Sequence, residues 1–226
     1  MKYDNITKGI FLSRPNRFLA HVEVDGEPIV CHVKNTGRLR ELLLAGAEVG
    51  LVHSDNPARK TAYDLVSVKK DGSWVNIDSM MANQAAEEWL TRGLLFSKAA
   101  VIRREVSFGG SRFDFYVEDG ERKIFLEVKG VTLIEEDTAK FPDAPTIRGV
   151  KHIRELEACI REGYEAYLLF VIQRKGATRF WPNWDTHREF GEALCHAKAS
   201  GVKLLAYDCF VDMGTVQVDA PVGIFL

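Results

Sequence analysis

The 226-residue sequence predicts two domains, a small β-barrel of the OB type followed by an α/β domain with a central mixed sheet. Two observations support this. The first third is a series of short, alternating strands separated by turn residues, with one short helical pattern in the middle. After Met80 the pattern changes to helices that alternate with apolar strands. We expect domains at residues 1–83 and 84–226.

The first domain contains six predicted strands. Alternation is clearest at residues 17–24, where Ala20 and Val22 share one face and His21 and Glu23 the other. A helix between the third and fourth strands is typical of an OB barrel, and an SH3-like barrel or a β-sandwich is the alternative. The predicted strands cover residues 8–13, 17–24, 28–34, 48–53, 63–69 and 74–77, and the helix covers residues 38–44.

The second domain is predicted to follow the order α-β-β-β-α-β-α-β. Residues 84–96 form a helix whose apolar face includes Leu90 and Leu94, and residues 146–162 form a strongly amphipathic helix. Three strands joined by glycine turns, followed by crossovers, predict a meander extended by parallel strands. The remaining predicted elements are strands at residues 101–108, 112–118, 123–133, 166–172 and 202–210 and a helix at 185–200.

Composition excludes several classes of protein. Hydrophobic residues make up 46% and charged residues 27%, which is typical of a globular domain. The sequence has neither an apolar run near the ~20 residues of a membrane span nor a secretion signal, so we expect a cytoplasmic protein without membrane contact. The four cysteines form no C-x-x-C pair, so we expect no structural zinc. The net charge of −2 argues weakly against nucleic-acid binding, although the first 40 residues hold seven Lys/Arg against four acids.

A group of carboxylates and a lysine is the strongest candidate site. Glu127 and Lys129 flank Val128 on an apolar strand, so they share one face about 7 Å apart. Asp114 lies on the preceding strand, between two phenylalanines, where a solvated charge is unexpected. Two carboxylates on adjacent strands suit Mg²⁺ or Mn²⁺, and a neighbouring ammonium suits phosphodiester hydrolysis. The alternative is a solvated strand face with a weak ion pair.

Several motifs resemble the sugar fermentation stimulation protein A family. They are R-x-N-R-F-L-A from Arg14, N-T-G from Asn35, S-R-F-D-F from Ser111, E-V-K-G-V-T-L from Glu127, and F-P-D-A-P-T-x-R-G-x-K-H-x-x-E-L from Phe141. The resemblance extends over nearly the whole chain. It implies an OB-like domain joined to a PD-(D/E)xK domain, which is restriction-endonuclease-like. It also implies binding of double-stranded DNA without strong sequence preference and a regulatory role in sugar (maltose) metabolism.

The resemblance also implies site residues. Asp114 matches the first carboxylate of the nuclease pattern, and Glu127 and Lys129 match its (D/E)xK pair, so Asp114 and Glu127 are the expected metal ligands. A glutamate on the first helix usually completes such sites. Glu88 matches N-x-x-x-x-E from Asn83, with Glu87 as the alternative. The proline of the pattern is absent, because Phe113 precedes Asp114.

Basic residues on connecting segments are the candidate DNA contacts. Arg148, Lys151 and His152 lie in the first turns of the helix that Thr146 is expected to cap, where free amides also suit a phosphate. Asp143, just before it, is a candidate for the metal site or for a loop cap. The candidates in the first domain are Arg14, Arg17, Lys34, Arg38, Arg59 and Lys60.

Three hypotheses follow from these residues. The protein binds DNA and cleaves it with Mg²⁺ or Mn²⁺; or it is a regulatory DNA-binding module with a vestigial nuclease site; or it is a small-molecule phosphodiesterase with the same metal chemistry. We expect no small-molecule cofactor. The oligomeric state is left open, with a homodimer as one option.

Overall fold

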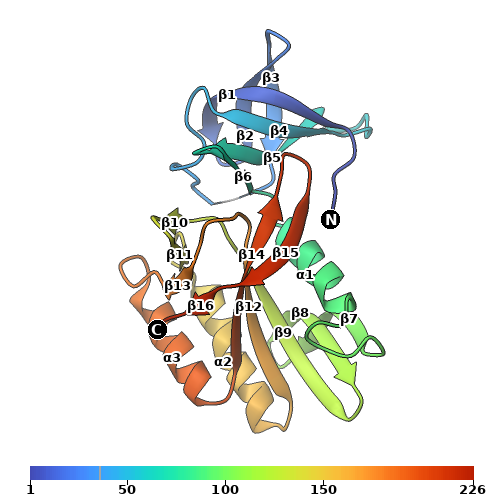
Figure 1. Cartoon of the computed structure of the whole chain (residues 1–226), viewed down its shortest axis with the longest axis vertical. Helices are drawn as coiled ribbons and strands as arrows, with labels where there is room; N and C mark the ends of the chain where they lie inside the picture. Colours follow the sequence, from blue (N-terminus) through green and yellow to red (C-terminus); the bar gives the residue numbers. More distant parts are fainter. Residues whose placement is uncertain (36) are drawn as a thin grey trace.

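Strands β1 to β5 close into a barrel in the computed structural model, which describes residues 1–35 and 37–226 (Figure 1). The neighbour order is β3-β2-β1-β4-β5-β6, and parallel pairing of β3 with β5 closes the ring. This confirms the OB-type barrel over the two alternatives. The strands cover Ile6–Asn16 (β1), Leu19–Val24 (β2), Glu27–Val33 (β3), Glu48–His53 (β4), Tyr63–Lys70 (β5) and Ser73–Asn76 (β6).

Local sequence explains how the barrel strands form and turn. On β2, Ala20 and Val22 point into the barrel core, whereas His21 and Glu23 are exposed. Asp25 and Gly26 between β2 and β3 have φ of 52° and 84°. Positive φ at both central residues of a two-residue hairpin matches the twist of the strands, and Asp-Gly adopts it readily.

The helix predicted at residues 38–44 is wrong. The segment forms successive turns, in which the Leu39 carbonyl accepts from the amides of Leu42 and Leu43. Leu39 itself has φ of 50°, which a right-handed helix does not admit. The apolar spacing that suggested a helix instead buries these leucines against the barrel core.

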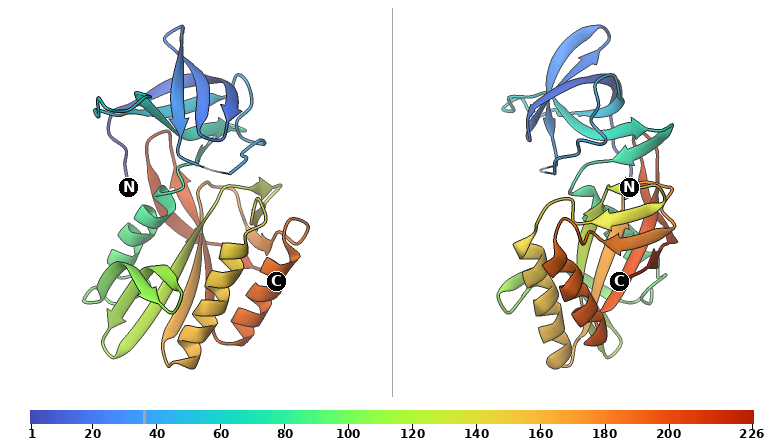
Figure 2. Two further views of the ribbon diagram at one scale, coloured as in Figure 1. Left: turned by 180° about the vertical axis from the view of Figure 1, so that it is seen from behind. Right: turned by 90° about the vertical axis from the view of Figure 1, so that its left-hand side faces the viewer.

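The α/β domain is a six-stranded mixed sheet covered on both faces (Figure 2). The strand order is β15-β14-β12-β9-β8-β7, in which β9, β12 and β14 are parallel. One face packs against α1, and the other against α2 and α3. The bounds are Met81–Thr91 (α1), Val101–Phe108 (β7), Ser111–Asp119 (β8), Arg122–Val131 (β9), Ile147–Arg161 (α2), Glu165–Ile172 (β12), Arg188–Ala199 (α3), Lys203–Val211 (β14) and Val216–Pro221 (β15).

Helix α1 is displaced from its predicted position. It begins at Met81 rather than residue 84, and its N-cap residue Met80 makes no side-chain capping hydrogen bond. It ends at Thr91, shortly before Gly93, which has φ of 76°. Leu94 therefore lies beyond the helix and is exposed, so its predicted pairing with Leu90 in the apolar face is wrong.

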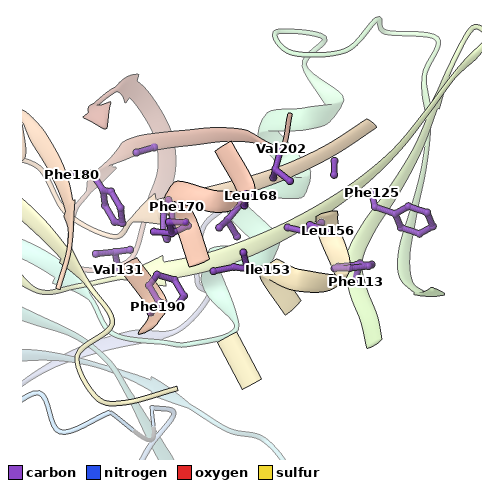
Figure 3. Packing of buried hydrophobic residues seen from close by; sticks show 14 of the residues in the cluster. Phe113, Phe125, Val131, Ile153, Leu156, Leu168, Phe170, Phe180, Phe190 and Val202 are labelled. Carbon is purple, nitrogen blue, oxygen red and sulfur yellow. The ribbon is translucent and has the colours of Figure 1, made fainter. Parts of the chain in front are cut away.

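A second, four-stranded sheet was not predicted. It has the order β10-β11-β13-β16, and its strands have only two to four residues, too few to show a period. Its strands are Ile134–Glu135 (β10), Thr138–Phe141 (β11), Arg179–Pro182 (β13) and Gly223–Ile224 (β16). The sheet covers part of the core beneath α2 and α3, where Phe180 stacks on Phe170 (Figure 3).

A buried polar junction holds the barrel against the α/β domain. The Gln173 side-chain amide donates to Asn76 Oδ1 at 2.7 Å and to the Asp78 carbonyl at 3.0 Å. The buried Asp78 carboxylate binds Lys34 Nζ at 2.9 Å and accepts from the Tyr3 hydroxyl at 3.2 Å. Because the buried Gln173 amide finds these two partners only when the domains are in contact, its hydrogen bonds help to hold the domains in their relative position.

The described residues contain no helix that combines the length and the apolar character needed to cross a membrane.

Glu165 tests how the parallel strands are held together. Its carboxylate at the start of β12 binds Arg122 of β9 and Lys203 of β14, and the Arg122 hydrogen bond lowers the pKa of Glu165 to about 2. A carboxyl group with a folded pKa below its unfolded value of about 4.3 stabilises the fold above that value and loses this contribution as the pH falls. We expect Glu165→Gln to lower the free energy of unfolding by about 1 kcal/mol at neutral pH, since the pair is partly exposed.

Urea denaturation across a pH series measures this effect. The difference between Glu165→Gln and wild type should shrink between pH ~4.3 and ~2. Glu121→Gln, which changes an exposed carboxylate in the neighbouring turn, is the control and should have little effect. A loss that is independent of pH, or equal in both variants, contradicts the assignment.

Candidate functional site: a carboxylate–histidine–lysine cluster

Strand β9 places Glu127 and Lys129 side by side on the sheet face covered by α2. Glu127 is only 3% exposed, and Lys129 Nζ donates to its Oε1 at 2.5 Å. Val128 points to the opposite face and packs with α1. The predicted arrangement, with Glu127 and Lys129 on one face and Val128 on the other, is therefore present. Glu127 is buried within the fold and does not lie on a solvated face.

Asp114 occupies the point at which β8 and β9 separate. The last paired residues there are Phe115 and Leu126. Beyond this pair, Asp114 Oδ2 accepts from the Val128 amide of β9 at 2.7 Å. Val128 directly follows Glu127, so this hydrogen bond brings the Asp114 carboxylate beside Glu127. Asp114 Oδ1 accepts from the Asn83 side chain of α1 at 2.6 Å. The site thus joins β8, β9 and the first turn of α1.

His152 belongs to this cluster and was predicted instead to contact DNA. Its side chain is 5% exposed, and its Nδ1 lies 2.5 Å from Glu127 Oε1. Its Nε2 lies 3.3 Å from Nε of Arg148, which can only donate. Nε2 is therefore the acceptor, and Nδ1 carries the proton that is donated to Glu127. No sequence pattern indicates this contact, because His152 and Glu127 are 25 residues apart and lie on different elements.

The two carboxylates have opposite electrostatic surroundings. Burial, followed by the negative charge of Glu127, raises the pKa of Asp114. Burial alone would also raise the pKa of Glu127, but the hydrogen bond from His152 and the charge of Lys129 outweigh it and hold that pKa below its usual range. Glu127 Oε2 is buried and has no hydrogen-bond partner among the described residues. Such an oxygen is costly unless another group satisfies it.

The structure does not bring Glu88 to the cluster. Its carboxylate binds the N-terminal ammonium of Met1 and the guanidinium of Arg92. Glu87, the alternative, lies four residues after Asn83 and therefore on the same face of α1, where it binds Arg104 at 3.1 Å. The helix residue that contacts Asp114 is Asn83, which was predicted only as the first residue of the N-x-x-x-x-E motif.

Several predicted DNA contacts are used inside the fold. Arg14 donates to the carbonyls of Arg17, Asn35, Gly37 and Arg38 at 2.7–2.9 Å and so holds the loop after β3. Thr36 of the Asn-Thr-Gly motif in this loop lies outside the described residues.

Other predicted contacts are also engaged with protein groups. Lys34 binds Asp78 at the domain junction, and Arg59 binds Asp64 through both terminal nitrogens. Lys151 Nζ donates to the Gly110 carbonyl at 2.7 Å, but its side chain remains exposed.

Three exposed arginines of the barrel lie together around one hollow. Arg17, Arg38 and Arg40 line a hollow of about 520 Å³, which we call the arginine hollow. None of the three forms an ion pair with any described residue. Arg40 was not among the predicted DNA contacts. Lys60 lies in a separate hollow with His32 and Arg59, and Arg148 is exposed on α2.

Asp143 lies at the boundary between the domains. Its carboxylate lies directly against Gly37 of the barrel loop. A Cβ built on Gly37 would lie 2.7 Å from Asp143 Oδ2. Thr146 caps α2 as predicted, since its hydroxyl accepts from the Gly149 amide at 3.0 Å. Asp143 therefore contacts the barrel loop rather than the carboxylate cluster.

Replacing His152 tests what keeps Glu127 ionised. In His152→Ala the burial of Glu127 is opposed by Lys129 alone, so we expect the pKa of Glu127 to rise. ¹³C NMR of the glutamate side-chain carboxyls measures it. His196→Ala is a matched control, since it removes another histidine bonded to a buried glutamate, Glu157, at 2.8 Å. The assignment is contradicted if the pKa of Glu127 is unchanged in His152→Ala, or if it shifts equally in His196→Ala.

Comparisons with known proteins agree with this architecture. The family profile described as the SfsA N-terminal OB domain matches residues 12–77, and that described as the sugar fermentation stimulation protein RE domain matches residues 80–215. A sugar fermentation stimulation protein homolog from Clostridium beijerinckii is 51% identical over the full length of both chains, and one from Ruminiclostridium cellulolyticum is 52% identical over the same extent.

A solved structure has the same fold over the whole chain. It is described as the structure of Pyrococcus furiosus SfsA in complex with Ca²⁺. It superimposes with a TM-score of 0.89 and 28% identity, and the match covers 100% of this chain and 98% of that one. With two family profiles and full-length relatives at about half identity, the chain belongs to the sugar fermentation stimulation protein family.

Proposed function

We propose that the protein binds double-stranded DNA without strong sequence preference and cleaves phosphodiester bonds with Mg²⁺ or Mn²⁺ at the Asp114–Glu127–Lys129 cluster. The observation that carries this proposal is Glu127 Oε2, a buried carboxylate oxygen without a hydrogen-bond partner among the described residues. A divalent cation would satisfy it, and neighbouring Asp114 supplies a second carboxylate.

The residues of the cluster fit a hard cation. Asp114 and Glu127 would hold it, and water and phosphate oxygens would complete a coordination shell that Mg²⁺ seldom takes from protein alone. When bound, the cation polarises phosphoryl oxygens and lowers the pKa of coordinated water. The related Pyrococcus furiosus protein is described as a complex with Ca²⁺, which also prefers oxygen ligands and so supports this choice of metal.

The other residues of the cluster have separate parts in the proposal. His152 and Lys129 both bind Glu127 Oε1, which keeps the carboxylate ionised and leaves Oε2 available. Lys129 is the more exposed of the two, so its ammonium is positioned to interact with a phosphate and offset developing negative charge. Asn83 of α1 donates one hydrogen bond to Asp114 Oδ1, and this leaves a second lone pair on that oxygen for a cation.

For DNA binding, the exposed and unpaired cations are the relevant ones. The arginine hollow offers Arg17, Arg38 and Arg40, and Arg148 and Lys60 add further exposed charges. Contacts of this kind bind phosphates and do not read base sequence. This matches DNA binding without sequence preference.

One observation favours a second function, a regulatory DNA-binding module without cleavage. Within residues 1–35 and 37–226 no three His, Cys, Asp or Glu side chains are grouped closely enough to hold a metal ion, and Glu88 binds the N-terminus instead. A role in regulating sugar metabolism belongs to this alternative. A site with two carboxylates could still hold a cation and a phosphate without hydrolysing it.

Plasmid cleavage distinguishes the two functions. Supercoiled and linear DNA are incubated with Mg²⁺ or Mn²⁺ and wild-type protein, Glu127→Gln, or the double variant Glu127→Ala/Lys129→Ala. We expect nicking or trimming by wild type and a loss of at least about 100-fold in both variants, the scale for removing a charged catalytic group. Glu157→Gln is a matched control, because Glu157 is also buried and bonded to a histidine but lies between α2 and α3. Cleavage that survives the double variant overturns the catalytic assignment.

The salt dependence of binding tests the DNA surface. Each phosphate contact contributes about 0.9 to the slope of log affinity against log salt concentration, so replacing Arg17, Arg38 and Arg40 with alanine should reduce the slope by about 2 to 3. Fluorescence anisotropy with a labelled duplex between about 50 and 200 mM salt measures this slope. Arg59→Ala is the control, since Arg59 already binds Asp64 and should not affect the slope. Wild-type affinity that is independent of salt contradicts the proposed contacts.

A further inference from the structure

A cavity lies between the barrel and the carboxyl ends of two parallel strands. It has a volume of about 320 Å³. Its lining consists of Asn35, Gly37 and Leu39 of the barrel, residues 130–133 at the end of β9, residues 140–146 before α2, and Ser79 and Gln173. Strands β9 and β12 end at this cavity, and ligands of open α/β sheets bind at the carboxyl ends of their strands. We call it the interdomain cavity.

The interdomain cavity lies next to the carboxylate cluster. Gly130 lines it and directly follows Lys129, and Glu127 is three residues earlier, about 10 Å along the strand. A Cβ built on Gly130 would lie 2.5 Å from Gln173 Oε1 and 3.1 Å from Ala82 Cβ, so a larger residue would displace the Gln173 side chain that also lines the cavity. The cavity therefore begins one residue beyond Lys129 along β9.

The interdomain cavity also continues into the arginine hollow. Gly37, Leu39 and Ala144 line both. The two differ in charge, because the hollow has the unpaired Arg17, Arg38 and Arg40. In the cavity Lys140 is bound to Glu135.

The rest of the cavity lining suits a group that is not an anion. Asp143 is negative, and most of the remaining lining is neutral and polar or apolar, such as Ser79, Thr132, Thr146 and Pro145. Such a lining suits a hydrogen-bonding, uncharged group, whereas the arginines suit phosphates.

We infer that this continuous groove binds an unpaired nucleic-acid strand, with its phosphates along the arginine hollow and one nucleoside in the interdomain cavity. The inference rests on the proposed function and names the substrate form that reaches the cluster. A cavity of small-molecule size has no room for a base pair with both backbones, so a nucleotide that enters it is unpaired. The buried junction of Asn76, Asp78 and Gln173 keeps the groove formed before the strand binds.

Filling the point where the cavity and the hollow meet tests the inference. Fluorescence anisotropy in EDTA, which prevents cleavage, is measured with a labelled single strand, a duplex carrying a single-stranded overhang, and a blunt duplex. We expect wild type to bind the first two at least about tenfold more tightly than the blunt duplex, the scale of enclosing one or two bases. Ala144→Trp should abolish this preference, because the indole would fill the point that the cavity and the hollow share.

A tryptophan placed far from the cavity and a cross-linking experiment serve as controls. Ala199→Trp changes an exposed alanine at the end of α3 and should keep the preference. Independently of any variant, a wild-type complex with a single strand carrying a terminal 4-thiothymidine should cross-link within residues 35–39 or 140–146. Equal affinity for single strand and blunt duplex, an unchanged preference in Ala144→Trp, or cross-links confined to other segments overturns the inference.

The outcome is separable from that of the proposed function. Single-strand preference without any cleavage leaves the groove intact and removes the nuclease assignment. Cleavage of blunt duplex by Ala144→Trp at the wild-type rate retains the nuclease assignment and removes the groove from substrate binding.

Discussion

The hydrogen bond from the Val128 amide to Asp114 is the contact on which the site depends. A backbone donor inside a sheet must be satisfied, and here a side chain does so where the neighbouring strand leaves the ladder. The same contact draws the Asp114 carboxylate next to the strand that carries Glu127 and Lys129. The separation of β8 from β9 thus opens the site. The hydrogen bond to Asp114 then satisfies the Val128 amide, which has lost its partner on β8.

Burial then determines how the charges are arranged. Two buried carboxylates close together repel each other. Their surroundings differ, so the pKa of Asp114 is raised while that of Glu127 is lowered. The difference arises because His152 and Lys129 both bind Glu127, whereas Asp114 is bound by neutral amides. Perturbed pKa values in groups with specific partners are frequent at functional sites, and structural ion pairs such as that of Glu165 also produce them.

Sequence reasoning succeeded where the signal was local. Alternation identified strands such as β2, and the spacing of Glu127 and Lys129 placed them on one face. It failed where a distant contact decides the outcome. A step of one residue turns a helix by about 100°, so Glu87 and Glu88 face different partners although a motif cannot separate them. Likewise, the pairing of His152 with Glu127 and the burial of Arg14 among backbone carbonyls depend on how distant segments fold together.

The net charge of −2 conceals a separation of charge that follows from these contacts. Most basic side chains are neutralised by nearby acids, as Lys34 is by Asp78 and Arg59 by Asp64. The three arginines of the arginine hollow have no such partner among the described residues. Beyond the interdomain cavity, the field of Asp114 and Glu127 would repel a phosphate, and a bound cation would reverse that field. Under the proposed function, the arginines would therefore attract a polyanionic strand with or without metal, whereas the carboxylates would accept it only with the metal in place, and the two proposed ligands would be coupled through charge.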